Sequence, residues 1–214
     1  MKTRIFNLLI LDESGSMHSI YNQALSTLNE TLQSARAAQK NFEGQEHFVS
    51  IVTFNSEKIS TILNCVDAEK TEDITPSQYN PNACTPLYDA IGKAVHDLMP
   101  HVSVDDKVLV TIITDGYENS SREYTADSVK KLTEMLEKKG WTFVYIGANQ
   151  DAAKVSHGLG IRNSLNFVAT ELGTSEMNDC LYERRKAWYK RVDDARNDCD
   201  GDGEHLTRGF FENE

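Results

Sequence analysis

The chain has 214 residues, of which 22 are basic and 33 acidic, giving a net charge of −11 at neutral pH. Such a charge disfavours binding to nucleic acid or to anionic membranes, and no stretch is apolar for long enough to span a bilayer. Hydrophobic residues make up 39%, which is enough for the core of one α/β domain with some sequence left over.

The N-terminus and the cysteines predict the compartment. An apolar segment begins at residue 4 and leaves no room for a signal peptide. The cysteines lack the paired spacing of zinc sites. We therefore expect a cytoplasmic protein whose four cysteines are free thiols: Cys65, Cys84, Cys180 and Cys199.

Strands and helices alternate along the chain. Residues 4–11 form a short apolar run, typical of a buried parallel strand. Apolar residues then recur at helical spacing from 17 to 40. After a strand at 47–54, a brief turn and the alternating segment 58–63 predict an antiparallel edge strand. The later elements are a long loop at 64–84, a helix starting at Pro86 with Thr85 as its cap, a strand at 107–114, a helix at about 126–139, a strand at 141–146, a short helix ending near Gly158 and a strand at 165–168.

This order of elements predicts the fold. Strands separated by helices imply a parallel sheet with right-handed crossovers. We therefore predict a Rossmann-like, doubly wound α/β fold, with a mostly parallel sheet of about six strands, one antiparallel edge strand and helices on both faces. This domain is expected to occupy residues 1–170.

The remaining residues, 171–214, are predicted to form an amphipathic helix and an acidic tail, packed on the domain or extending from it. The helix is indicated by apolar residues at helical spacing: Met177, Leu181, Trp188, Val192 and Ala195. The tail segment from Asp198 to Asp202 begins like a calcium-binding loop, but Gly209 stands where such a loop needs a glutamate. Calcium binding by the tail is left open.

Three oxygen-bearing side chains follow the first strand. Asp12, Ser14 and Ser16 are spaced at every second residue, and a tight loop can turn their oxygens toward one point. Oxygen ligands favour a hard cation such as Mg²⁺, at roughly 2.0–2.1 Å from each oxygen. The simpler alternative is that the two serines cap the helix while Asp12 closes a turn.

The D-x-S-x-S pattern resembles the metal-ion-dependent adhesion site of von Willebrand factor A domains. Thr85, within the segment 84–91, looks like part of the family's second metal loop, and Asp115, after the strand at 107–114, looks like part of the third. The resemblance covers roughly residues 3–168 and is to cytoplasmic bacterial members of the family.

The resemblance implies a set of metal ligands. Ser14, Ser16 and Thr85 would contact the cation directly, and Thr85 would engage it when an acidic ligand binds. Asp12 and Asp115 would contact it directly or through water. The topology selects the same place, because ligands of open α/β sheets bind beyond the carboxyl ends of the strands, where these loops lie.

From the residues and the resemblance together we predict a non-catalytic protein-binding module. A divalent cation, Mg²⁺ or Mn²⁺, would bind an Asp or Glu of a partner protein. Loop position alone suggests five residues for the rim of the site: Tyr79, Asn82, Tyr117, Glu118 and Asn149.

Two alternatives are weighed. A metal-dependent phosphohydrolase would use Asp12 as its nucleophile, but enzymes of the haloacid dehalogenase type usually carry a second aspartate where Ser14 stands here. Glu13 and His18 could transfer protons, yet each is interpreted as a surface residue without an evident partner. The other alternative, a regulatory subunit of an AAA-ATPase or chelatase assembly, uses the same metal-dependent binding. The sequence leaves the partner, the pathway and the oligomeric state open.

Overall fold

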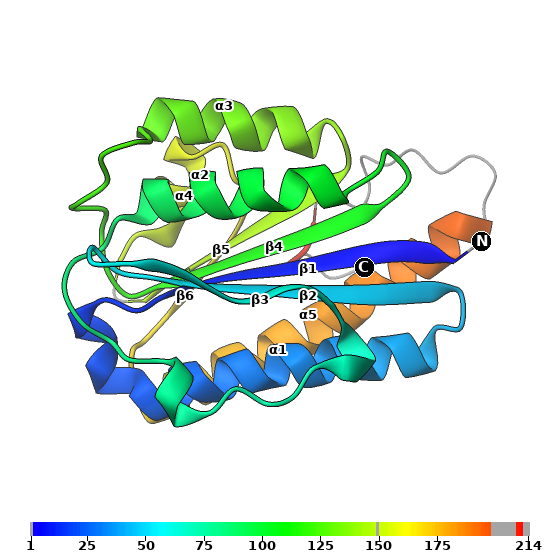
Figure 1. Cartoon of the computed structure of the whole chain (residues 1–214), viewed down its shortest axis with the longest axis horizontal. Helices are drawn as coiled ribbons and strands as arrows, with labels where there is room; N and C mark the ends of the chain where they lie inside the picture. The colour runs from blue at the N-terminus through cyan, green and yellow to red at the C-terminus, as the bar shows by residue number, and fades with distance from the viewer. Residues whose placement is uncertain (1, 149, 198–208, 212–214) are drawn as a thin grey trace.

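The protein is a three-layer α/β sandwich in a computed structural model that describes residues 2–148, 150–197 and 209–211. In Figure 1, α2, α3 and α4 cover the upper face of the sheet, while α1 and α5 cover the lower face. The strands are β1 (Thr3–Asp12), β2 (Gln45–Phe54), β3 (Ile59–Asp67), β4 (Lys107–Thr114), β5 (Trp141–Ala148) and β6 (Asn163–Phe167). The helices are α1 (Tyr21–Asn41), α2 (Leu87–Leu98), α3 (Ala126–Glu137), α4 (Ala152–Gly158) and α5 (Glu171–Asn197), with 3₁₀ turns η1 (Gly15–Ile20), η2 (Ala68–Lys70), η3 (Pro76–Gln78) and η4 (Met99–His101).

The sheet has the order β3-β2-β1-β4-β5-β6. All neighbouring strands are parallel except β3, which pairs antiparallel with β2 at the edge. The predicted fold class is therefore confirmed. From β1 the chain passes to β2 on one side and later returns to β4 on the other, so the topological switch point lies between the carboxyl ends of β1 and β4.

Alternation along β1 explains why both faces of the sheet are covered. Ile5, Leu9 and Leu11 belong to the lower cluster, which α1 and α5 complete. Phe6, Leu8 and Ile10 point the other way, into the upper cluster formed with α2 and α3. Burying each large apolar side chain is worth roughly 1.5–3 kcal/mol, so β1 is fixed firmly from both sides.

The connection between the edge strand and α2 differs from the prediction. The edge strand continues to Asp67 instead of ending at residue 63, and two 3₁₀ turns interrupt the segment expected to be a plain loop. The helix begins at Leu87 with Pro86 in the capping position, so Thr85 is not its cap. The hydroxyl of Thr85 is therefore not used in starting the helix.

The C-terminal helix packs along α1 on the lower face. Met177, Leu181, Trp188 and Val192 of its apolar stripe are buried, and Trp188 donates a hydrogen bond to the Thr142 hydroxyl (3.2 Å). The tail segment 198–202, where calcium binding was left open, lies outside the described residues. Among the described helices, none combines the length and the apolar character needed to cross a membrane.

Candidate metal centre

The first candidate ligand, Asp12, is the last residue of β1 and is fully buried. Its carboxylate accepts a hydrogen bond from the Ser14 backbone N–H at Oδ1 (2.7 Å) and another from the Thr114 hydroxyl at Oδ2 (2.5 Å). Burial raises the pKa of Asp12 to about 6, although these hydrogen bonds oppose the rise. The contact with Ser14 is the turn closure that the simpler interpretation expected.

Hydroxyl groups connect this first loop to the loop after β4. The hydroxyl oxygens of Ser14 and Ser16 lie 3.2 Å apart, and the Ser16 hydroxyl donates to Asp115 Oδ1 (2.6 Å). Ser14 is buried, Asp115 is half-buried and Ser16 is exposed, so the chain of oxygens leads from the interior to solvent. The Ser14 side chain makes no capping hydrogen bond to η1, so the capping alternative is wrong for this serine.

Thr85 lies close to this group of oxygens but is held differently. Its backbone N–H donates to the Asn119 side chain (2.8 Å), and its carbonyl accepts from the Asn119 N–H (3.1 Å). A Cβ placed on Gly116 would lie 3.2 Å from the Thr85 hydroxyl oxygen and 3.9 Å from that of Ser16. The two hydroxyls therefore face the same glycine, and within the described chain no hydrogen bond joins the Thr85 hydroxyl to the other four candidate ligands.

The electrostatics of these residues fit a cation. Burial raises the pKa of Asp115 as well as that of Asp12. In the part of the chain that the structure describes, no ion pair includes either carboxylate. Two carboxylates and three hydroxyls form an all-oxygen set, which suits Mg²⁺ or Mn²⁺ better than a softer metal. The candidate ligands are Asp12, Ser14, Ser16, Thr85 and Asp115.

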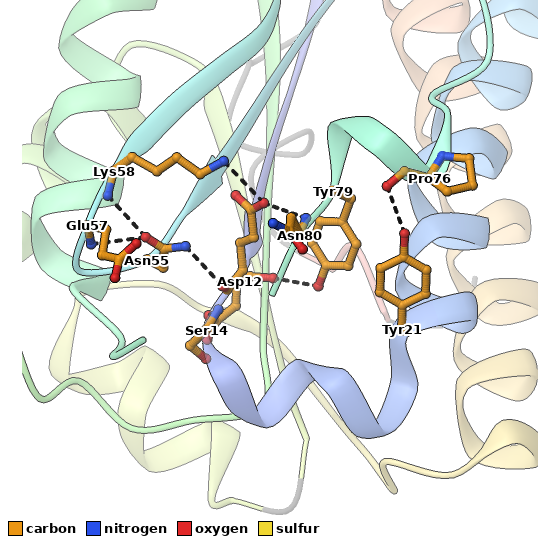
Figure 2. A network of polar contacts seen from close by, with 10 residues as sticks. Asp12, Ser14, Tyr21, Asn55, Glu57, Lys58, Pro76, Tyr79 and Asn80 are labelled. Carbon is orange, nitrogen blue, oxygen red and sulfur yellow. Dashed lines mark hydrogen bonds and ion pairs between the residues drawn. The ribbon is translucent and has the colours of Figure 1, made fainter. Parts of the chain in front are cut away.

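The residues expected at the rim of the site differ in their exposure and in their contacts. Tyr79 was wrongly placed there, because it is fully buried and its hydroxyl donates to the Asp12 carbonyl (2.8 Å; Figure 2). Asn82 and Tyr117 are exposed, the latter by 58%. The Glu118 carboxylate accepts backbone hydrogen bonds at the start of α2 and within its own loop, so it organises the loop. Asn149 lies outside the described residues.

The two residues considered for proton transfer, His18 and Glu13, also differ in burial. His18 is exposed, as interpreted from the sequence, but Glu13 is fully buried, which corrects the expectation of a surface residue. Asp12 is poorly placed to act as a nucleophile, because it is buried and both of its carboxylate oxygens accept hydrogen bonds.

Sequence reasoning missed the groups that support the site. Thr114 stood next to Asp115 at the end of a predicted strand, which was the available signal for its contact with Asp12. Asp89, on α2, accepts the backbone N–H groups of residues 122, 123 and 124. Together with Asn119, it fixes the loop after β4 to the start of α2, although no motif marked it.

Comparisons with protein-family models and with curated proteins find no match. Among solved structures, a mutant of the PilB minor pilin from Streptococcus sanguinis is similar, with a TM-score of 0.62 and 13% identity over 89% of this chain and 64% of that chain. The vWF domain of the type V pili tip protein Mfa5 from Porphyromonas gingivalis has a TM-score of 0.58 and 10% identity, over 84% of this chain and 95% of that domain. Proximal thread matrix protein 1 from the mussel byssus has a TM-score of 0.56 and 15% identity, over 90% of this chain and 46% of that chain.

These likenesses concern the fold alone, because the identities are low. They support a von Willebrand factor A-like fold, since the vWF domain of the pilus tip protein is covered almost completely. The chain spans about two thirds of the pilin structure and about half of the byssus protein.

Proposed function

We propose that this protein is a non-catalytic, metal-dependent protein-binding module. The observation that carries the proposal is the run of hydrogen bonds from buried Asp12, through Ser14 and Ser16, to Asp115 at the switch point of the sheet. Neither carboxylate has a basic partner among the described residues. Mg²⁺ would supply a positive charge there, and Mn²⁺ has overlapping oxygen preferences.

The chain's own residues would divide the task of binding. Asp12 is fixed by Thr114 and by the backbone of its own loop, so it would hold one side of the cation rigidly. Ser16 is exposed and would lie nearest to an incoming ligand. Mg²⁺ prefers six oxygens, whereas the chain offers five groups, so an Asp or Glu of a partner protein can complete the set.

A hollow beside the site would contribute specificity. It has a volume of about 540 Å³ and opens between α2, α4 and the loop after β4. Tyr117, two residues after Asp115, is one of its walls and is exposed by 58%. We propose that a side chain adjacent to the partner's acidic residue enters this hollow, which is lined by Tyr88, Tyr117, Lys154, Val155 and Leu159.

The von Willebrand factor A-like fold that the structural neighbours support is compatible with a protein-interaction module. For the compartment we propose the cytoplasm, supported by the free thiols of Cys65, Cys84 and Cys180. There the partner could be an AAA-ATPase or chelatase-type assembly, which would use the same metal-dependent contact.

A pull-down tests the proposed function. The tagged protein is incubated with lysate in Mg²⁺ or in chelator, and captured proteins are identified by mass spectrometry. A specific partner should appear in Mg²⁺ only. At a Mg²⁺ concentration high enough to keep the variant loaded with metal, Thr85→Ala should still weaken capture of that partner. Partner capture that is indifferent to chelator would contradict the proposal.

The phosphohydrolase alternative has its own test. We expect no phosphate release from generic phosphomonoesters with Mg²⁺ present, because Asp12 is buried and fully hydrogen-bonded. Turnover that disappears in Asp12→Asn would replace the binding function with catalysis.

A further inference from the structure

Residues 71–84, called the strap below, connect the edge of the sheet to Thr85. In Figure 1 this segment passes along α1 on the lower side and then rises around the carboxyl edge of the sheet to α2. Its first half is tied to α1: the Asn29 side chain exchanges two hydrogen bonds with the Ile74 backbone, and Tyr21 donates to the Pro76 carbonyl (2.8 Å). Its second half delivers Thr85 to the candidate metal centre.

Glu13 holds that second half of the strap. Its side-chain Oε1 accepts the backbone N–H of Asn80 (2.6 Å), and its carbonyl accepts that of Asn82 (2.8 Å). The Tyr79 hydroxyl donates to the carbonyl of the preceding residue, Asp12 (2.8 Å; Figure 2). Three contacts, from residues 79, 80 and 82, therefore fasten the strap to the peptide that also carries the first candidate ligand.

The turn between β2 and β3 supports Glu13 from the other side. The Glu13 N–H donates to the Phe54 carbonyl (2.8 Å), and the Asn55 side chain donates to the Glu13 carbonyl (3.3 Å). Lys58 places its ammonium 3.5 Å from Glu13 Oε1. The Glu13 side chain is fully buried whereas that of Lys58 is 51% exposed, so Lys58 compensates the buried charge from the surface.

The strap reaches the site in a strained conformation. Ala83 has a φ of 62°, in the left-handed region that residues with a Cβ rarely adopt. Its carbonyl accepts the Gly15 N–H (3.0 Å), between the two serines of the first loop. Such a conformation persists only where the surroundings impose it.

We infer that Glu13 is a positioning residue: it clamps the strap to the first loop and thereby fixes Thr85, two residues beyond Ala83, at the metal centre. The inference rests on the proposed function in that Thr85 is taken as a metal ligand. Groups that hold ligands in place without touching the metal commonly contribute about 10–100-fold to affinity.

Calorimetric titration of the full chain with Mg²⁺ and with Mn²⁺ tests this role. Glu13→Ala should weaken metal binding by about 10–100-fold. Glu13→Gln retains an oxygen acceptor for the Asn80 N–H and should restore most of the affinity. The matched control is Glu57→Ala, which removes an exposed carboxylate from the neighbouring turn and should leave the affinity unchanged. If Glu13 had a merely structural role, Glu13→Ala would lower the melting temperature of the protein. Its metal affinity, measured at a temperature far below that melting temperature, would then be unchanged.

Hydrogen exchange in chelator tests the clamp without metal. The amides of Asn80 and Asn82 should exchange faster in Glu13→Ala than in the wild type, and equally in Glu57→Ala. If Glu13→Ala does not fold, Glu13→Asp, whose carboxylate is one methylene short, should show both effects. A wild type that binds no metal would overturn the proposed function, while the exchange arm would still decide on the clamp. This inference would be overturned if the Glu13 variants kept the metal affinity of the wild type and their Asn80 and Asn82 amides exchanged as slowly as in the wild type.

Discussion

The two ends of the central strands bury polar groups in opposite ways. At the amino end, Asn7 of β1 and His47 of β2 face α5, and their hydrogen bonds run through Gln45 to the Tyr189 carbonyl (2.7 Å) and back from the Tyr189 hydroxyl to Asn7 (2.8 Å). At the carboxyl end, the hydrogen bonds that start at buried Asp12 pass through exposed Ser16 and finish at half-buried Asp115.

The difference between these networks separates structure from function. The network at the amino end is neutral and closes on itself, so it fixes the position of α5 and has no group left for a ligand. The network at the carboxyl end contains two carboxylates and reaches solvent, which costs stability unless a cation binds. An open, charged network at the switch point is therefore the better candidate for a binding site.

Removing α5 should have the largest effect, because it opens the closed network. Truncation after Val168 removes six buried apolar side chains worth roughly 1.5–3 kcal/mol each, comparable with the total stability of a domain, about 5–15 kcal/mol. The truncated chain should aggregate or show no cooperative melting transition by circular dichroism. A truncated protein that melts like the full chain would mean that α5 is an independent docking element. The apolar side chains lost are Met177, Leu181, Trp188, Tyr189 and Val192 of α5 and Phe210 beyond it.

Asp12→Ala should abolish measurable Mg²⁺ binding in calorimetry, because it removes the most rigidly held carboxylate of the open network. The fold should survive, since Asp12 ends its strand and its charged form is disfavoured by burial. Circular dichroism serves as the control for folding. Retained metal affinity in a folded Asp12→Ala protein would mean that the cation, if any, binds elsewhere.

The closed network should lose stability in acid, because its member His47 has to stay neutral in the folded protein. Burial lowers the pKa of His47 from 6.5 to about 3, so the folded protein keeps this imidazole neutral while the unfolded chain protonates it below pH 6.5. Its contribution to stability is present above pH 6.5 and falls by about 1.4 kcal/mol per pH unit as the pH drops toward 3. Urea unfolding at several pH values should show this loss in the wild type. The same slope in His47→Gln would assign the loss to other groups.

Asp12 should show the opposite pH dependence in the metal-free protein. Its pKa rises from 3.8 to about 6 on folding, so the folded state favours the protonated carboxyl, and this contribution is lost as the pH rises from about 4 through 6. The cost at neutral pH is about 3 kcal/mol. Asp12→Asn should therefore raise the melting temperature in chelator at pH 7.5, and saturating Mg²⁺ should cancel the advantage. A lower melting temperature in chelator would show that the buried carboxylate is stabilising by itself.

The sequence by itself determined the fold class and the chemistry of the candidate ligands. The alternation of apolar strands and amphipathic helices requires a parallel sheet covered on both faces, and the carboxyl ends of β1 and β4 then have to meet at one edge. Asp12 ends β1 and Asp115 follows β4, so their neighbourhood could be predicted from local pattern alone. The ligand assignment itself came from resemblance and stays a prediction.

Only the tertiary structure decided which polar residues are buried and what they hold. Glu13 and Tyr79 looked like surface residues, because nothing local indicates that the strap folds back over the end of β1 to cover them. The closed network likewise joins Asn7 to Tyr189, 182 positions apart. Such contacts depend on the path of the whole chain in space, whereas periodicity reports only which face of its own element a residue occupies.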